Sequence, residues 1–188
     1  MCITYLETDK TLKLITNDHT PWIKYWERLK YSSKILKKNI EYVFKSMHEA
    51  NSSEIPEIKA TIEAYMLILG YSQENLIKGA LMRKHFLEFG KCSFSDLKEI
   101  KKNVWRNADG HSLVKLTEKN EVLQIHKAER NILTRLEEYI KWAGRYEFSQ
   151  NLEERNTEML KKIEIHDWDD DIISQFEWRL FEKMRKGW

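Results

Sequence analysis

The chain has 188 residues, of which 41% are hydrophobic and 33% charged, and its net charge is +2. Only six glycines and two prolines interrupt it, a composition that suits one helical globular domain and excludes collagen-like, loop-rich and disordered classes. No run of 18 apolar residues is present, and charges occur within the first 16 positions. We therefore expect neither a transmembrane helix nor a signal peptide.

Charge and cysteine content narrow the class of protein further. Residues 151–188 hold ten acidic and seven basic residues, so this tail carries −3 and residues 1–150 carry +5. The isoelectric point of about 8.4 is lower than that of proteins that coat nucleic acid, so an RNA ligand is permitted and not required. Cys2 and Cys92 match no metal-binding spacing, and we expect free thiols in a reducing cytoplasm.

The first predicted elements are an arm and a long helix. Weak alternation over 1–16 indicates a short hairpin or an extended arm. A capping Asp18 or Thr20 followed by Pro21 predicts a helix from residue 22 to about residue 49. Seven residues at helical spacing are expected on its buried face: Trp22, Trp26, Leu29, Ser33, Leu36, Ile40 and Phe44.

A second long helix follows, with Ser52 or Ser53 as its cap and Pro56 near its start. Gly70 and Gly79 lie inside it, where each costs about 1 kcal/mol relative to alanine, so we expect them to mark close packing or a bend. Its apolar stripe comprises Ile58, Ile62, Tyr65, Leu69, Leu76, Ala80 and Leu87.

The second half of the chain predicts shorter helices. Ser93 or Ser95 caps a short helix that ends near Val104, and another helix begins within "HSLVKLTEK". A further helix over 127–143 ends at Gly144 and carries five inward-facing residues, which are Ile132, Leu133, Leu136, Tyr139 and Ile140. In the helix that begins within "HSLVKLTEK", we expect Leu113, Leu116 and Val114 to face inward.

"HDWDDD", residues 166–171, resembles a metal-binding run by composition alone. Adjacent residues on a helix point in different directions, and acidic residues favour a first turn, so we interpret this run as a helix start. The pattern predicts an all-α antiparallel bundle, in which 1–150 form the main domain and 151–188 an acidic helical extension packed on it.

One short stretch, "WRNADGH" at 105–111, concentrates chemistry-bearing residues: Trp105, Arg106, Asn107, Asp109 and His111. Arg106 and His111 match a pattern of an arginine and a histidine separated by four to six residues. About one such pair is expected by chance in a chain of this composition, so the spacing alone carries little weight. On this spacing alone, both residues would be ordinary polar groups at helix ends.

Three blocks in order give that stretch a context: "GYSQENLIKGALM" at 70–82, "GHSLVKL" at 110–116 and "LEEYIKWAGRY" at 136–146. They resemble the HEPN superfamily, small helical bundles of toxin–antitoxin, antiviral and RNA-processing systems. The blocks cover less than half of the chain. The family's Gly-Arg-Tyr is usually followed by proline, where this chain has Glu147.

The resemblance implies a metal-independent endoribonuclease that acts as a toxin or antiviral effector, with no cofactor. Arg106 would stabilise the phosphate, His111 would act as base or acid, and Asn107 would orient them. Histidine titrates near neutral pH and arginine grips phosphate bidentately, so the chemistry is coherent. The backbone N–H groups at the start of the helix that follows His111 are expected to attract phosphate.

The resemblance also implies supporting residues and partners. Glu74 would support Arg106 or His111, although Glu74 and Lys78 at i,i+4 spacing also suit a solvated pair. Arg145 and Tyr146 would contact RNA or pack the end of the bundle. The expected partners are an RNA substrate, a second copy sharing one cleft, and an antitoxin protein.

Two other functions remain open from the sequence. The first is a non-catalytic HEPN module that binds RNA or a partner protein, in which His111 only caps a helix. The second is a partner of a nucleotidyltransferase, or a binder of small nucleotides.

Overall fold

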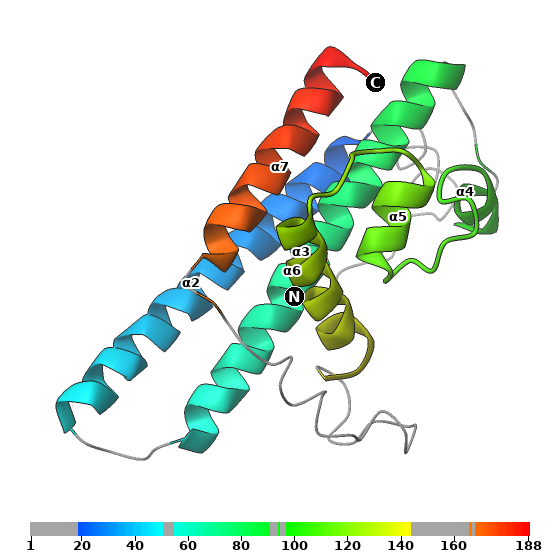
Figure 1. The fold of residues 1–188 in the computed structure, drawn as a ribbon. Coiled ribbons are helices and arrows are strands. Elements are labelled where there is room, and N and C mark those ends of the chain that lie inside the picture. Colours follow the sequence, from blue (N-terminus) through cyan, green and yellow to red (C-terminus); the bar gives the residue numbers. More distant parts are fainter. Residues whose placement is uncertain (1–18, 51–54, 91–93, 95–96, 144–165, 167) are drawn as a thin grey trace, which may run out of the picture.

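The computed structural model describes residues 19–50, 55–90, 94, 97–143, 166 and 168–188. Within these residues the structure is helical and has no strands, which confirms the all-α class. Three long helices lie side by side: α2 (Thr20–Ala50), α3 (Ile55–Phe89) and α7 (Asp169–Lys186) (Figure 1). The arm predicted over 1–16 lies outside the described residues.

Shorter elements pack around this layer: α4 (Leu97–Asn103), α5 (Leu113–Lys119), α6 (Lys127–Glu138) and the π-helix η1 (Tyr139–Ala143). The predicted helices are present, except that the last predicted turn after α6 is π-helical. The caps predicted at Ser52 or Ser53, at Ser93 or Ser95 and at Gly144 lie outside the described residues. The central element is α3, which contacts α2, α5, α6, α7 and η1.

The central position of α3 follows from its sequence, because its apolar residues are spread around the helix and not confined to one face. Both internal glycines mark the close packing that we predicted. A Cβ added at Gly70 would lie 2.8 Å from Cγ1 of Ile140, and one at Gly79 would lie 2.9 Å from Cδ1 of Ile23. Neighbouring helices therefore approach the backbone of α3 at both positions.

Two residues assigned to buried faces are exposed, and these assignments were wrong. Phe44 is 52% exposed because α7 begins at the level of Lys37 in α2. Lys37 is ion-paired with Asp170 in the first turn of α7. Phe44 lies seven residues, or about 10 Å, beyond that level of α2. Leu87 is 47% exposed in the last turn of α3, which fewer helices cover.

Polar contacts anchor α7 to the bundle at several points along its length. The carboxylate of Glu177 accepts hydrogen bonds from Nζ of Lys30 at 2.8 Å and from Nε2 of Gln73 at 2.6 Å. Further along, Arg179 donates to both carboxylate oxygens of Glu129 at 2.7 Å. The acidic first turn predicted for this helix is present. Among the described helices, none has the length and apolar character of a membrane span.

Candidate functional site around His111

The stretch that carries the candidate residues is a tight turn between α4 and α5. Its backbone is tied down by hydrogen bonds from the N–H of Asn107 to Lys101 O at 2.9 Å and from the N–H of Ala108 to Trp105 O at 2.9 Å. Arg106 and Asn107 have φ angles of 48° and 56°, in the left-handed region. Asparagine tolerates this conformation, whereas it costs about 1–2 kcal/mol for most residues. The left-handed backbone at position 107 therefore accounts for an asparagine there.

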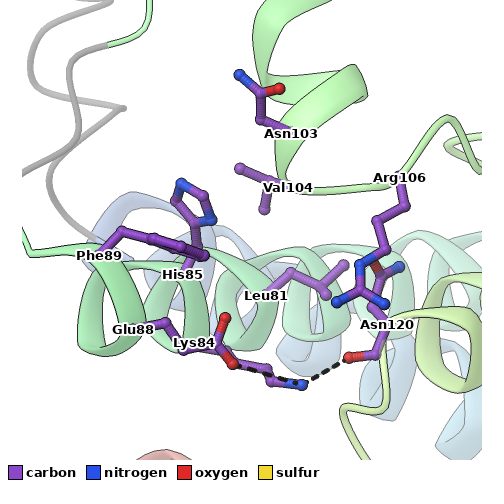
Figure 2. Close-up of a pocket in the computed structure, with 9 residues that line it drawn as sticks. All are labelled: Leu81, Lys84, His85, Glu88, Phe89, Asn103, Val104, Arg106 and Asn120. Atoms are coloured by element: carbon purple, nitrogen blue, oxygen red, sulfur yellow. Dashed lines mark hydrogen bonds and ion pairs between the residues drawn. The ribbon is translucent and has the colours of Figure 1, made fainter.

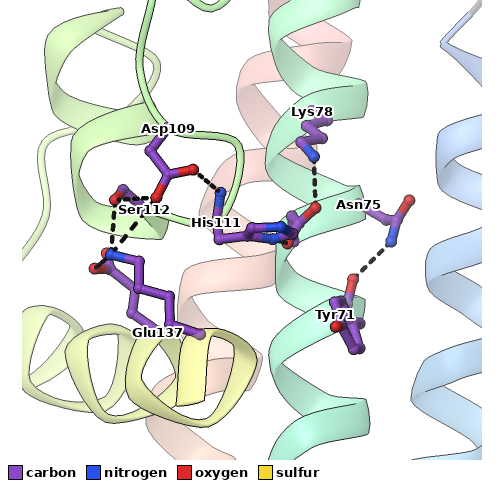
Figure 3. Close-up of polar contacts among 9 residues, drawn as sticks. Tyr71, Asn75, Lys78, Asp109, His111, Ser112 and Glu137 are labelled. Carbon is purple, nitrogen blue, oxygen red and sulfur yellow. Dashed lines mark hydrogen bonds and ion pairs between the residues drawn. The ribbon is translucent and has the colours of Figure 1, made fainter. Parts of the chain in front are cut away.

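His111 is held by a carboxylate from the central helix. Its Nδ1 lies 2.8 Å from Oε2 of Glu74, and its backbone N–H donates to Oδ1 of Asp109 at 3.3 Å (Figure 3). The His111 side chain is 36% exposed, whereas that of Glu74 is 8% exposed. In the described part of the chain, Nε2 of His111 has no hydrogen-bond partner. The imidazole is thus oriented from the buried side and keeps one nitrogen available to solvent.

The same carboxylate binds Lys78, one turn further along α3. The ammonium lies 2.5 Å from Oε1 of Glu74 and 4.5 Å from the centre of the Trp105 ring. Both charged side chains are only 8% exposed, so this pair is buried and not solvated. A Cβ at Gly110 would lie 3.3 Å from Nζ of Lys78, so the glycine directly before His111 packs closely on this ammonium. The structure therefore brings Glu74, Lys78 and His111 together.

Arg106 lies elsewhere on the surface. Its side chain is exposed, donates a hydrogen bond to Lys119 O at 3.2 Å, and lines a cavity together with Lys84 and His85 (Figure 2). Lys84 follows Glu74 by ten residues on α3, a separation of about 15 Å along a helix. In one copy of the chain, Arg106 and His111 thus face different stretches of the central helix.

Several residues next to His111 had not been singled out for the site from the sequence. Oε1 of Glu137 in α6 accepts a hydrogen bond from the N–H of Val114 at 2.7 Å. Lys141 donates to Oγ of Ser112 at 2.9 Å and lies 3.8 Å from Oδ2 of Asp109. A carboxylate therefore occupies the start of α5, where we had expected backbone groups to be open to phosphate. The i,i+4 spacing of Glu137 and Lys141 was visible in the sequence, but their partners were not.

The predicted RNA-binding residues Arg145 and Tyr146 lie outside the described residues. A scan against protein-family models finds no matching family, and neither a curated protein nor a solved structure matches the chain.

We expect the buried cap at α5 to produce a measurable pH dependence. Burial raises the pKa of Glu137 above its ordinary value near 4.5. A raised pKa in the folded state contributes stability below the unfolded pKa, and this contribution is lost as the pH rises through the folded value. Glu137→Gln removes the titration while keeping an acceptor for Val114. The free energy of unfolding of this variant, relative to wild type, should therefore increase between pH 4 and pH 7.

Urea unfolding at both pH values measures this difference. Glu88→Gln is the control because its carboxylate is 43% exposed and its partner Lys84 binds Asn120, at the opposite end of α5 from Val114. A variant that loses stability relative to wild type as the pH rises would show that the charged carboxylate is the favourable form of the cap.

Proposed function

We propose that this chain is a HEPN-type, metal-independent endoribonuclease that acts as a toxin or antiviral effector, with His111 as its proton-transfer group. The observation that carries the proposal is the contact of 2.8 Å between Nδ1 of His111 and the buried carboxylate of Glu74. A carboxylate in this position holds the proton on Nδ1 and leaves the lone pair on Nε2 directed outward. This is the arrangement that a histidine general base requires.

The proposed reaction needs only protein groups and RNA. Nε2 of His111 takes the proton of a ribose 2′-hydroxyl, and the 2′-oxygen attacks the adjacent phosphorus. The bond from phosphorus to the 5′-oxygen breaks, and an acid gives that oxygen a proton. The products are a 2′,3′-cyclic phosphate and a 5′-hydroxyl end.

One copy of the chain lacks two of the parts that this reaction uses. Arg106 is directed to another stretch of α3, and Lys78 is committed to Glu74. The homodimer expected from the motif resemblance would supply both a second histidine as the acid and additional cationic groups. We therefore propose that the cleavage site forms between two copies whose 105–112 segments face each other.

The test is cleavage of single-stranded RNA in EDTA by wild type, His111→Ala and His111→Gln. We expect both variants to lose about 10²–10⁴ of the rate, because they lack the proton-transfer group. His126→Gln is the control, because this exposed histidine lies at the start of α6. Circular dichroism checks that the variants fold, and solution mass should be twice 22.7 kDa.

A non-catalytic RNA- or protein-binding module is the second candidate, and the separation of Arg106 from His111 favours it. On this alternative, Glu74, Lys78 and His111 form a structural network only. Wild type that leaves RNA intact in EDTA, or His111→Gln that cleaves like wild type, would establish the module and exclude the nuclease.

A further inference from the structure

A cavity on the surface between α3 and the segment 103–106 has a chemical character that the proposed cleavage step does not use. Its volume is about 310 Å³, at the small end of the range for ligand pockets, which runs from about 300 to 1,000 Å³. Five of its lining side chains are charged or aromatic: Lys84, His85, Glu88, Phe89 and Arg106 (Figure 2).

Arg106 brings uncommitted positive charge to this cavity. A guanidinium has five N–H donors, and among the described residues that of Arg106 makes one hydrogen bond, to Lys119 O. Among the described residues no carboxylate is paired with Arg106. In contrast, the ammonium of Lys84 is bonded to the carbonyl oxygens of Asn120 and Glu121 and lies 3.8 Å from Oε1 of Glu88. Arg106 is therefore the group in the cavity that is able to grip an anion.

The left-handed backbone at Arg106 adds weight to this interpretation. Strained residues persist where the surrounding structure holds them, and they are concentrated at functional sites. A glycine would adopt a φ of 48° without cost, yet this position carries an arginine whose side chain lines a cavity.

At the other end of the cavity from Arg106 lies an aromatic surface (Figure 2). Phe89 is 66% exposed, and its ring centre lies 4.7 Å from that of His85. His85 also lies 5.4 Å from the ring of Phe94, so the three rings form one aromatic cluster. Burial lowers the pKa of His85 and so favours its neutral form, and the ring adds to the aromatic surface. Nucleobases stack on surfaces of this kind.

We infer that this cavity binds one nucleotide unit, with its base against Phe89 and His85 and its phosphate on Arg106. The inference deepens the proposed function and rests on it, because it takes RNA as the source of that unit. The cavity lies about 15 Å along α3 from Glu74. The nucleotide it holds is therefore distinct from the one cleaved at His111, and the cavity anchors the strand.

The test uses the full chain with His111→Ala, so that bound RNA is not cleaved, and a labelled single-stranded RNA of twelve nucleotides. Fluorescence anisotropy gives the dissociation constant as a function of salt concentration. Arg106→Gln and Phe89→Leu should each weaken binding about fivefold or more. Phe89→Tyr keeps the ring and should bind within about twofold of the parent.

Salt dependence separates the two roles. Loss of one phosphate contact reduces the magnitude of the slope of log binding constant against log salt concentration by about 0.7 for a single strand. Arg106→Gln should therefore reduce this slope, and Phe89→Leu should leave it unchanged. Arg83→Gln is the matched control for Arg106→Gln. It removes a cation from α3, next to Lys84, that does not line the cavity. Unchanged binding in both cavity variants, or an equal loss in Arg83→Gln, would overturn the inference.

Two further results separate this inference from its alternatives. AMP that displaces the RNA at micromolar concentration, with the same dependence on Arg106 and Phe89, would assign the cavity to a free nucleotide and overturn the RNA source. Wild type that binds RNA through these residues without cleaving it would support the cavity and refute the nuclease.

Discussion

Glu74→Leu should lower the free energy of unfolding by about 3–5 kcal/mol, because it leaves Lys78 buried without its carboxylate. The ammonium would retain the faces of Trp105 at 4.5 Å and Trp22 at 5.7 Å, which compensate an ion only in part. Urea unfolding of the variant measures the loss. Glu88→Leu on the same helix is the control, because its carboxylate is 43% exposed and its pair with Lys84 should contribute at most about 1 kcal/mol.

The double variant Glu74→Leu, Lys78→Met distinguishes the two roles of Glu74. Replacing a whole buried ion pair by apolar side chains is often neutral or stabilising, so the double variant should regain most of the lost stability. It should not regain RNA cleavage, because Nδ1 of His111 would still lack its acceptor. A double variant as unstable as Glu74→Leu would mean that Lys78 does not depend on Glu74. Recovery of cleavage would mean that Glu74 only supports the fold.

The helical architecture follows from local signals, and these could be read from the sequence. Pro21 near the start of α2 and the acidic run at 169–171 mark helix starts without any knowledge of the fold. Gly70 and Gly79 indicated close helix packing because glycine is costly inside a helix. Burial at the helix ends could not be read in this way. The exposure of Phe44 and Leu87 depends on where neighbouring helices begin and end.

The candidate site depends on contacts across the chain, and these were only partly visible. The i,i+4 spacing of Glu74 and Lys78 suited both a solvated pair and a support for the site. The pair is buried because the 105–112 turn covers Glu74 and Lys78. Arg106 and Asn107 both have left-handed backbones, and this conformation directs the Arg106 side chain. The spacing of Arg106 and His111 in the sequence does not reveal it. The capping of α5 by Glu137 joins residues 23 positions apart and leaves no local signature.

Phe176→Ala should also be strongly destabilising, by about 3–5 kcal/mol, because this side chain in α7 is fully buried and its loss leaves a cavity. Trp178→Ala is a matched control two residues away on the same helix. Its side chain is 65% exposed, so its truncation should change stability by no more than about 0.5 kcal/mol. Equilibrium unfolding in urea gives both values.

The m-value, which is the slope of the free energy of unfolding against urea concentration, shows whether α7 is an integral part of the bundle. Glu177 and Arg179 tie this helix to α2, α3 and α6, so α7 should unfold together with them in one transition. Phe176→Ala would then lower the midpoint and leave the m-value unchanged, because the same surface is exposed on unfolding. A smaller m-value in Phe176→Ala, with little loss of stability, would show that α7 detaches before the other helices unfold. The last helix would then be an accessory to a core formed by α2, α3 and α6.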